Sequence, residues 1–467
     1  MGVASAALPV AAPASRGLTW GLTWGLWAFI WLLPFHIVAI AALFGVVGLP
    51  LLVVRGIAAW KEATVALLVA LTLLGALRGR TARSPVQATD LAVTALCALA
   101  CVYLVGATVW FSSDLPAIVQ LYGWRDAVFF TLLYFVGRAT PQVAQNPSYF
   151  RALFAVGVIT SAIAILERLF VTPQMLVVLG AARYMQEFLG FAAGTRSNPY
   201  GLPDNYWTSI GDHVVQRVGS TYLSSQYFAV PFLLILPAAT LWLFSSERRR
   251  ATFGWVGYAI LWTGLLLTLT RMTIVTCAIQ VLALAGARRR WGMAVSAGLA
   301  ALVGFALALV AVPGLATFVW DTLTWQTGSS VGHLTDWSLG VQSLVDHPLG
   351  VGLGAGGLTA ARFGLTSAAA DSQFFKYSAE LGLPGLALYL AILAGIAMAG
   401  VKAFRTASGE SGRNCGALVA VATLGLALNG TTTVPLTDPF FGYIYFWLAG
   451  AVVTVAGRAA RAGTGES

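Results

Sequence analysis

Long apolar runs dominate this chain and limit the folds that it can adopt. Hydrophobic residues make up 58% of its 467 residues and charged residues only 9%, against about a quarter in soluble domains. Many runs reach about 20 residues, the length that a helix needs to cross a ~30 Å hydrocarbon core. A membrane β-barrel would instead show short alternating segments. The sequence therefore predicts an all-α, polytopic membrane helical bundle, with one integral membrane domain over residues 1–467.

The polar breaks between the runs predict about 12 transmembrane helices and a cytoplasmic C-terminus. The candidate spans are residues 19–33, 36–54, 63–77, 90–110, 117–137, 150–172, 226–245, 252–270, 271–287, 292–312, 378–400, 415–430 and 441–457. The N-terminus lacks a basic region before its first apolar run, so no cleaved signal peptide is expected.

Arginine-rich loops orient these spans. The triplets Arg248–Arg250 and Arg288–Arg290 are typical of cytoplasmic loops, where Lys and Arg accumulate. The residues between them fit a helical hairpin whose turn, near Arg271, faces the opposite side. Two longer polar segments then fall outside the cytoplasm. We expect residues 173–225 and 313–376 to form two large periplasmic loops.

The first 80 residues fit this orientation poorly. Arg55 and Lys61 look cytoplasmic, and so do Arg78, Arg80 and Arg83, yet a single candidate span separates the two groups. Either that span does not cross the membrane, or the spans before it are miscounted.

Composition and motifs exclude several function classes. The net charge of +10 is explained by cytoplasmic Arg better than by nucleic-acid binding. The four cysteines lie in or beside apolar runs, which is typical of buried thiols. No CxxC, HExxH or P-loop motif occurs, and no DxD motif or carboxylate cluster is found in the predicted outer loops. We therefore expect neither a cofactor nor a metal, and no nucleic-acid partner.

The second outer loop, 313–376, is where the sequence predicts chemistry. It is the longest stretch in the second half of the chain that cannot span a membrane, and a protein that only anchors itself has no need for it. It contains His333, Arg362 and Asp371 and a glycine-rich run at 350–357. No strand is predicted before this run, so it is a weak nucleotide-binding signal. Its glycines are expected to allow tight turns and a close backbone approach to a lipid or sugar.

Two arginines are expected at the same outer face. Arg217 follows the first outer loop, and Arg271 lies in the apolar sequence LTLTRMT. An arginine in such a setting is costly and suggests a functional site, although a residue at the interface could also extend its charge into water. Guanidinium groups bind phosphate oxygens in pairs and keep their charge. A phosphate-bearing lipid is the expected ligand.

Four motifs in order carry a resemblance to a known family. They are RVGST, LTLTR, WSLGVQSLVDHPLGVGLG and DSQFFKYSAELGLPG, over roughly residues 217–385. The chain resembles the O-antigen ligase and polymerase superfamily. The resemblance implies a many-helix membrane enzyme in the bacterial inner membrane. Such an enzyme moves a glycan from an undecaprenyl-diphosphate carrier onto an acceptor hydroxyl at the periplasmic face, with inversion and without a nucleotide sugar.

The resemblance also implies roles for individual residues. Arg217 and Arg271 match the diphosphate-binding arginines of the family. Asp371 stands where ligases typically have a His that activates the acceptor, and His333 stands where the family often has Arg. The first difference favours a polymerase over a ligase.

Asp371 has two interpretations. A carboxylate can remove the proton of an acceptor alcohol, so Asp371 is the first candidate for the general base. Asp is also a favoured helix N-cap, and the residue could only cap the helix that follows. His333 is the second candidate for the base.

Further residues are weaker candidates for substrate contact. They are Tyr222, Gln373, Arg362, Lys376 and Arg125. Loop charges such as Arg362 and Lys376 are more often simply solvated, and Arg125, beside Asp126, lies in a candidate span, where charges usually pair.

The leading hypothesis is a polymerase of lipid-linked repeat units for O-antigen or exopolysaccharide. Its partners would be the undecaprenyl-diphosphate-linked glycan and membrane lipid, with a chain-length regulator protein as a further candidate. The alternative is a ligase that transfers the glycan to lipid A core or to protein. A lipid or polysaccharide transporter is disfavoured, because no convincing internal repeat occurs and the polar groups concentrate at one face.

Overall fold

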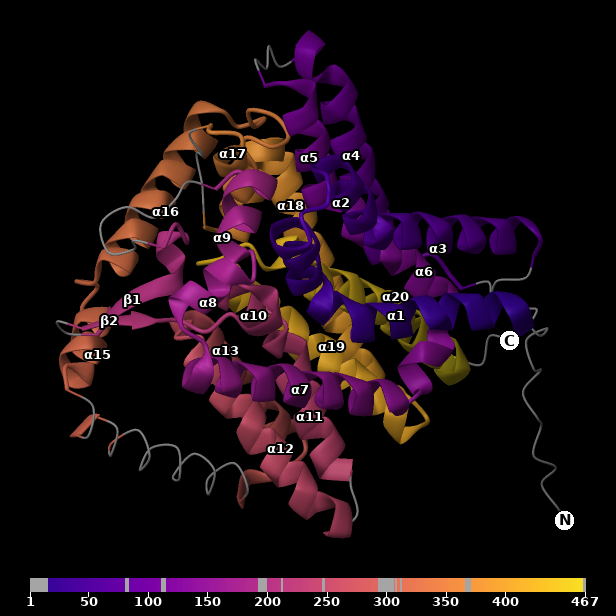
Figure 1. Cartoon of the computed structure of the whole chain (residues 1–467). Helices are drawn as coiled ribbons and strands as arrows, with labels where there is room; N and C mark the ends of the chain where they lie inside the picture. Colours follow the sequence, from indigo (N-terminus) through magenta and orange to yellow (C-terminus); the bar gives the residue numbers. More distant parts are fainter. Residues whose placement is uncertain are drawn as a thin grey trace, which may run out of the picture.

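The computed structural model is a helical bundle whose long helices are flanked by short ones at one end (Figure 1). It describes residues 16–79, 84–110, 115–191, 200–210, 213–245, 248–292, 306, 309–310, 313–365 and 371–464. In this part of the chain eight helices are long and apolar enough to cross a membrane, and two shorter apolar helices, Phe253–Leu267 and Arg271–Ala287, accompany them. The predicted all-α, polytopic fold class is confirmed. The predicted span 292–312 lies mostly outside the described residues.

The first half of the chain supplies helices α1 to α9. Their bounds are α1 Arg16–Ala41, α2 Leu51–Ala58, α3 Trp60–Leu77, α4 Ala88–Trp110, α5 Ala117–Val128, α6 Leu132–Ala139, α7 Ser148–Phe170, α8 Pro173–Val178 and α9 Ala181–Arg183. Short 3-10 or π turns join or extend several of them, namely η1 Ala42–Val46, η2 Phe129–Thr131, η3 Pro141–Gln145, η4 Tyr184–Phe188 and η5 Asp204–Tyr206.

The second half supplies one small hairpin and the remaining helices. Strands β1 Trp207–Ile210 and β2 His213–Gln216 pair antiparallel, with Trp207 opposite Gln216. The helices are α10 Ser225–Ala229, α11 Phe232–Ser245, α12 Arg248–Leu267, α13 Arg271–Ala287, α15 Leu315–Leu323, α16 Gly328–Asp346, α17 Gly357–Arg362, α18 Gln373–Thr406, α19 Glu410–Asn429 and α20 Pro439–Thr464, with turns η6 Ser220–Tyr222 and η7 Pro435–Thr437.

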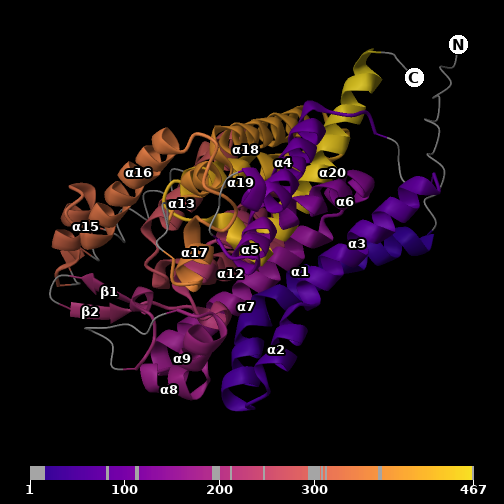
Figure 2. The same cartoon turned by 90° about the horizontal axis from the view of Figure 1, so that it is seen from above.

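The N-terminal helices correct the predicted spans. Residues 19–33 and 36–54 were expected to be separate, but Pro34 lies inside α1, which runs on through η1 as one apolar helix, Gly21–Val46. A proline can stay within a membrane helix when neighbouring groups bond the freed carbonyls. The main-chain oxygen of Pro34 itself accepts an additional hydrogen bond, from Oγ1 of Thr221 at 2.5 Å, which connects α1 to the turn that contains Thr221. The chain then turns at Gly48, and α2 and α3 return beside α1 (Figure 2).

Helix α20 forms the centre of the bundle. It packs against α6, α18 and α19, and 94% of its most apolar window is buried. Its contact with α6 depends on small residues, as is common between membrane helices. A Cβ at Gly450 would lie 2.0 Å from the main-chain oxygen of Tyr134, and one at Gly137 would lie 2.0 Å from that of Trp447.

The turns at the two ends of the bundle come from distant parts of the chain. At one end Ser245, Arg288, Arg290, Glu410 and Asn414 surround a small pocket. This agrees with the prediction that these arginine-rich loops share a side. At the other end, the turn between α12 and α13 meets Arg217, and the start of α18 meets the residues after α19. We call this second end the site end.

Candidate functional site

Arg217 is anchored at the site end between β2 and the turn that joins α12 to α13. Its guanidinium donates to the main-chain oxygens of Thr268 at 3.0 Å and Asn205 at 3.3 Å, and to Oγ1 of Thr270 at 2.9 Å. These acceptors are neutral, so they orient the positive charge without neutralising it. Burial, and then the nearby charge of Arg271, lower the pKa of Arg217 to about 10. Arg217 therefore stays charged near neutral pH.

Arg271, the first residue of α13, approaches from the other side of the same turn. Its Nη1 donates to Oγ1 of Thr322 at 2.6 Å and of Thr327 at 3.3 Å, and its guanidinium lies 5.3 Å from the ring centre of Phe318. Within the described ranges neither arginine forms an ion pair with a carboxylate. The structure thus brings together the two arginines that the sequence singled out, with their charges uncompensated.

The segment RVGST is held in place by a buried carboxylate. Glu167 of α7 accepts from the backbone N–H of Ser220 at 2.6 Å and, more weakly, from that of Gly219 at 3.4 Å. Ser220 has a positive φ of 49°, an unfavourable conformation for a residue with a side chain. The Ser220 hydroxyl also donates to the main-chain oxygen of Thr160 at 2.7 Å. These bonds fix the turn that follows Arg217.

Asp371 belongs to a cluster with His333 and Asp336. One potential ligand atom from each residue lies within 4.8 Å of the others, and Nδ1 of His333 is buried without a hydrogen-bond partner. The N-cap of α18 is Ser372, whose hydroxyl accepts from the backbone N–H of Phe375. The alternative that Asp371 only caps this helix is therefore wrong.

The surroundings of Asp371 favour its protonated form. Burial raises its pKa, Asp336 raises it further, and His333 opposes this change. A carboxyl with a raised pKa is better suited to act as a base near neutral pH than an ordinary Asp. By their donor atoms and spacing, His333, Asp336 and Asp371 could also hold a divalent cation.

Helix α16 connects Arg271 to the cluster of His333, Asp336 and Asp371. Thr327 caps its first turn, accepting from the backbone N–H of Ser330 at 3.2 Å, and the same hydroxyl oxygen accepts from Arg271. His333 lies on the second turn of the helix. One turn further, Nε1 of Trp337 donates to the main-chain oxygen of Thr431 at 2.8 Å. A shift of α16 would therefore move His333 relative to both Arg271 and Asp371.

The glycine-rich run packs against the chain's own backbone. A Cβ at Gly354 would lie 2.5 Å from the main-chain oxygen of Val119 in α5, and one at Gly382 in α18 would lie 2.4 Å from that of Pro348. Gly382 has a φ of 66°, which kinks α18. There the N–H of Leu383 donates to the oxygen of Pro348. The sequence predicted a close approach to a lipid or sugar, but the approach seen at Gly354 and Gly382 is to the chain's own backbone, so the HPLGVGLG and ELGLPG motifs form one contact.

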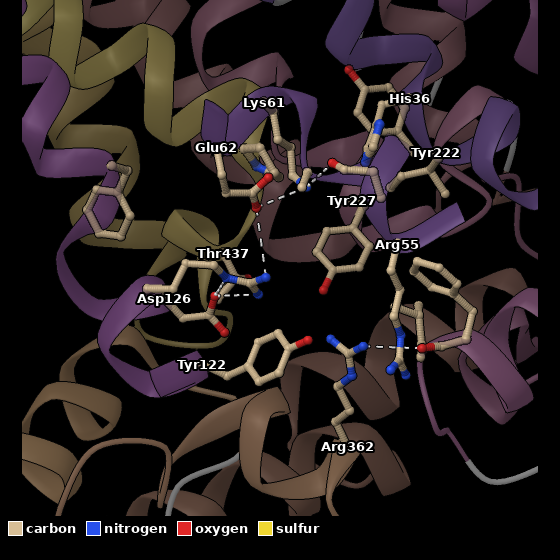
Figure 3. A pocket seen from close by; sticks show the side chains of 18 of the residues that line it. His36, Arg55, Lys61, Glu62, Tyr122, Asp126, Tyr222, Tyr227, Arg362 and Thr437 are labelled. Atoms are coloured by element: carbon tan, nitrogen blue, oxygen red, sulfur yellow. Dashed lines mark hydrogen bonds and ion pairs between the residues drawn. The ribbon is translucent and has the colours of Figure 1, made fainter. Parts of the chain in front are cut away.

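A cavity of about 380 Å³ opens between α1, α2, α5, α17 and the start of α20 (Figure 3). Four basic residues line it, Arg55, Lys61, Arg125 and Arg362, together with Glu62 and Asp126. Tyr122, Tyr222, Tyr227 and Thr437 also line it, and the hydroxyl groups of Tyr122 and Tyr227 point into the space (Figure 3). Its apolar wall includes Ile37, Met185, Phe188 and Leu436.

Only part of the positive charge in the cavity is neutralised. Lys61 lies 3.1 Å from Glu62, and Arg125 lies 2.8 Å from Asp126. Asp126 also accepts from Oγ1 of Thr359 in α17 at 2.7 Å. Within the described part of the chain, Arg55 and Arg362 form no ion pair. Arg362 donates to the main-chain oxygen of Phe188 at 3.2 Å and lies 4.9 Å from the ring centre of Tyr122.

The weaker candidates from the sequence divide into two groups. Tyr222, Arg125 and Arg362 line the cavity. Lys376 does not: its side chain is 1% exposed, and its Nζ lies 2.7 Å from Glu380 in a buried pair, so it offers no open surface to a substrate. Gln373 is fully buried, and its Oε1 accepts from the N–H of Leu436 at 3.2 Å.

Sequence reasoning missed the contribution of the N-terminal helices. His36, Arg55, Lys61 and Glu62 line the cavity but were not candidates. One signal in the sequence could have indicated them. Arg55 and Lys61 looked cytoplasmic, and so did the arginines after residue 77, although a single candidate span separates the two groups. Once α1 is one helix, both residues follow its far end, at the same end of the bundle as Thr437.

Comparison with known proteins gives one match. Residues 256–390 match the family model described as O-antigen ligase, and no curated protein matches the chain. The matched segment includes Arg271, His333 and Asp371, and the two motifs that meet at Gly382. The resemblance seen in the sequence is thereby confirmed. Residues 256–390 are thus similar to an O-antigen ligase domain, which is consistent with the O-antigen ligase and polymerase superfamily.

Proposed function

We propose that this protein is a membrane glycosyltransferase that polymerises undecaprenyl-diphosphate-linked oligosaccharide repeat units at the periplasmic face of the bacterial inner membrane. The observation that carries the proposal is the arrangement at the site end. Among the described residues, two neighbouring arginines have no carboxylate partner, and one of them, Arg271, is connected through α16 to the cluster that contains Asp371, whose pKa is raised. A transfer from a lipid diphosphate requires positive charge to stabilise the anionic leaving group, and a general base for the acceptor hydroxyl. The arginines and Asp371 are suited to these two roles.

Asp371 and the two arginines have different roles in the proposed reaction. Asp371 accepts the proton of the acceptor hydroxyl as its oxygen attacks the anomeric carbon of the donor sugar. The bond between that carbon and the diphosphate oxygen breaks, and the configuration at the carbon inverts. Arg217 and Arg271 stabilise the negative charge that develops on the departing diphosphate. No nucleotide or metal takes part in this scheme, and His333 orients Asp371 or replaces it as the base.

A ligase is the second candidate, and the description of the matched family favours it. It would use the same donor and the same arginines, with lipid A core or a protein hydroxyl as acceptor. Asp371, at the place where ligases of this superfamily typically have His, favours the polymerase.

The proposal is tested with purified protein in detergent and a lipid-linked repeat unit. We expect a ladder of longer glycans without added nucleotide and in the presence of EDTA. Arg271→Ala should lower the rate about 10²- to 10³-fold, the usual effect of removing one donor to a developing negative charge. Full activity of this variant would contradict the role of Arg271. A single transfer that occurs only when lipid A core or a protein acceptor is added would identify a ligase.

A further inference from the structure

The cavity between α1, α2, α5 and α17 carries positive charges that the reaction scheme does not use. Its two carboxylates are paired with Lys61 and Arg125, which leaves Arg55 and Arg362 facing the same space. Both also line an adjoining smaller pocket. Glu187 borders that pocket, but it pairs with Arg183 at 3.1 Å. Arg55 is exposed and Arg362 is half-buried, so both guanidinium groups are accessible to an anion that enters the cavity and can bind it.

The other groups around the cavity indicate the class of anion. Tyr122 offers a hydroxyl group beside Arg362, as phosphate oxygens require (Figure 3). The wall formed by Met185, Phe188 and Leu436 is apolar, and a free, hydrated phosphate would gain nothing from it. A phosphate attached to a lipid fits both parts. The volume of about 380 Å³ lies within the range of ordinary ligand sites.

The cavity is connected to both parts of the proposed active site. Leu436 lines it and donates its N–H to Gln373, which lies two residues after Asp371. Tyr222 also lines it and belongs to the turn that follows Arg217. A ligand in the cavity is therefore bound at the same end of the bundle as Arg217 and Asp371, but by different cations.

Polymerisation requires two lipid diphosphates at once, and the chemistry assigns them to different places. In the donor, the diphosphate is bonded to the reacting carbon, so it must lie close to the base. In the acceptor, the reacting hydroxyl is on a sugar of the repeat unit, so the diphosphate lies the length of an oligosaccharide away. Arg271 is joined to the Asp371 cluster by the first turns of α16, as the donor site requires. The cavity is lined by other elements.

Resting on the proposed polymerase function, we propose that the cavity lined by Arg55 and Arg362 is the binding site for the diphosphate of the acceptor lipid. Arg55 from α2 and Arg362 from α17 bind its phosphate oxygens. Tyr122 supports Arg362 and donates a hydrogen bond, and the apolar wall receives the first part of the prenyl chain. The enzyme then has two arginine pairs, one for each lipid.

Native mass spectrometry of the full-length protein in detergent, with undecaprenyl diphosphate as the probe, tests this assignment. We expect two bound lipids on the wild type. The double variant Arg55→Gln/Arg362→Gln should bind one of them at least tenfold more weakly, and Arg217→Gln/Arg271→Gln should lose the other. Arg168→Gln is the matched control, because Arg168 is exposed and does not line the cavity, and it should retain both. Tyr122→Phe, which keeps the aromatic ring, should weaken the same binding event even if the double variant folds poorly.

The outcomes separate this inference from the function on which it rests. Two lipids on the Arg55→Gln/Arg362→Gln variant, with normal chain growth, would overturn the acceptor site and leave the polymerase intact. Two lipids on a wild type that never extends a glycan would refute the polymerase and the acceptor role together. Inorganic pyrophosphate is the second probe. If it binds to the cavity as tightly as the lipid does, the occupant is a soluble phosphate and the lipid assignment fails.

Discussion

At the scale of single residues, Asp371 and its two neighbours determine the protonation chemistry. Burial and the negative charge of Asp336 raise the pKa of Asp371, whereas the positive charge of His333 would lower it. A general base must be deprotonated, so activity should fall as the pH drops through this pKa. The raised pKa places that fall above the range of an ordinary Asp.

Replacing Asp336 should therefore shift the pKa of Asp371 in a known direction. Asp336→Asn removes a like charge, so it should lower the pKa of Asp371 and shift the acidic limb of the pH–rate profile to lower pH. The rate of Asp336→Asn at its pH optimum should stay within about tenfold of the wild-type rate. The rate of Asp371→Asn should fall by about 10²- to 10⁴-fold. The profile is measured by chain growth between pH 4 and pH 9. If Asp336→Asn is as inactive as Asp371→Asn and EDTA inhibits the wild type, the three residues hold a metal ion instead.

At the scale of elements, the contact between the loop before α17 and the kink in α18 positions the base. The kink at Gly382 interrupts α18, and the loop supplies acceptors and donors where the helix lacks its own. Leu383 donates to Pro348 at 2.8 Å, and Val351 donates to Ala379 at 2.7 Å. Because Asp371 directly precedes α18, the direction of that helix determines where its carboxylate lies.

A side chain at Gly382 should break this contact. In Gly382→Ala the new Cβ would lie 2.4 Å from backbone atoms of Leu349 and Pro348, and the φ of 66° would itself be strained. We expect a loss of about 2–4 kcal/mol of stability from strain and overpacking together, seen as a lower unfolding temperature in detergent, with reduced activity.

The matched control for that variant is Gly364→Ala. Gly364 also has a positive φ, 70°, but no other atom lies within 4 Å of its added Cβ. Its cost should be the strain alone, about 1–2 kcal/mol. Equal losses in the two variants would show that the backbone contact at Gly382 contributes nothing.

At the scale of the whole molecule, the parts that the sequence could predict are those built from local pattern. The all-α class, the hairpin around Arg271 and the arginine pair follow from apolar runs, charge and motif. The buried ion pair of Lys376 and the existence of the cavity could not be predicted from local sequence patterns. Arg55, Arg125 and Arg362 come from three distant segments, and only the packing of α2, α5 and α17 brings them together. The charge of Arg55 suggested the cytoplasmic side, and the sequence left open whether residues 63–77 fail to cross or residues 19–54 were miscounted; the single helix through Pro34 shows the miscount.

The corrected path of the first two long helices predicts on which side of the membrane Arg55 lies. Helices α2 and α3 form one apolar segment, Leu51–Leu77, with the exposed Arg55 near its start and the exposed Arg78 just after its end. If the site end faces the periplasm, Arg55→Cys should react in intact cells with a thiol reagent that does not cross the inner membrane. Arg78→Cys should react only after permeabilisation. The wild type provides the background of the four native cysteines. Labelling of Arg78→Cys but not of Arg55→Cys in intact cells would reverse the orientation and place the cavity and the arginine pair in the cytoplasm.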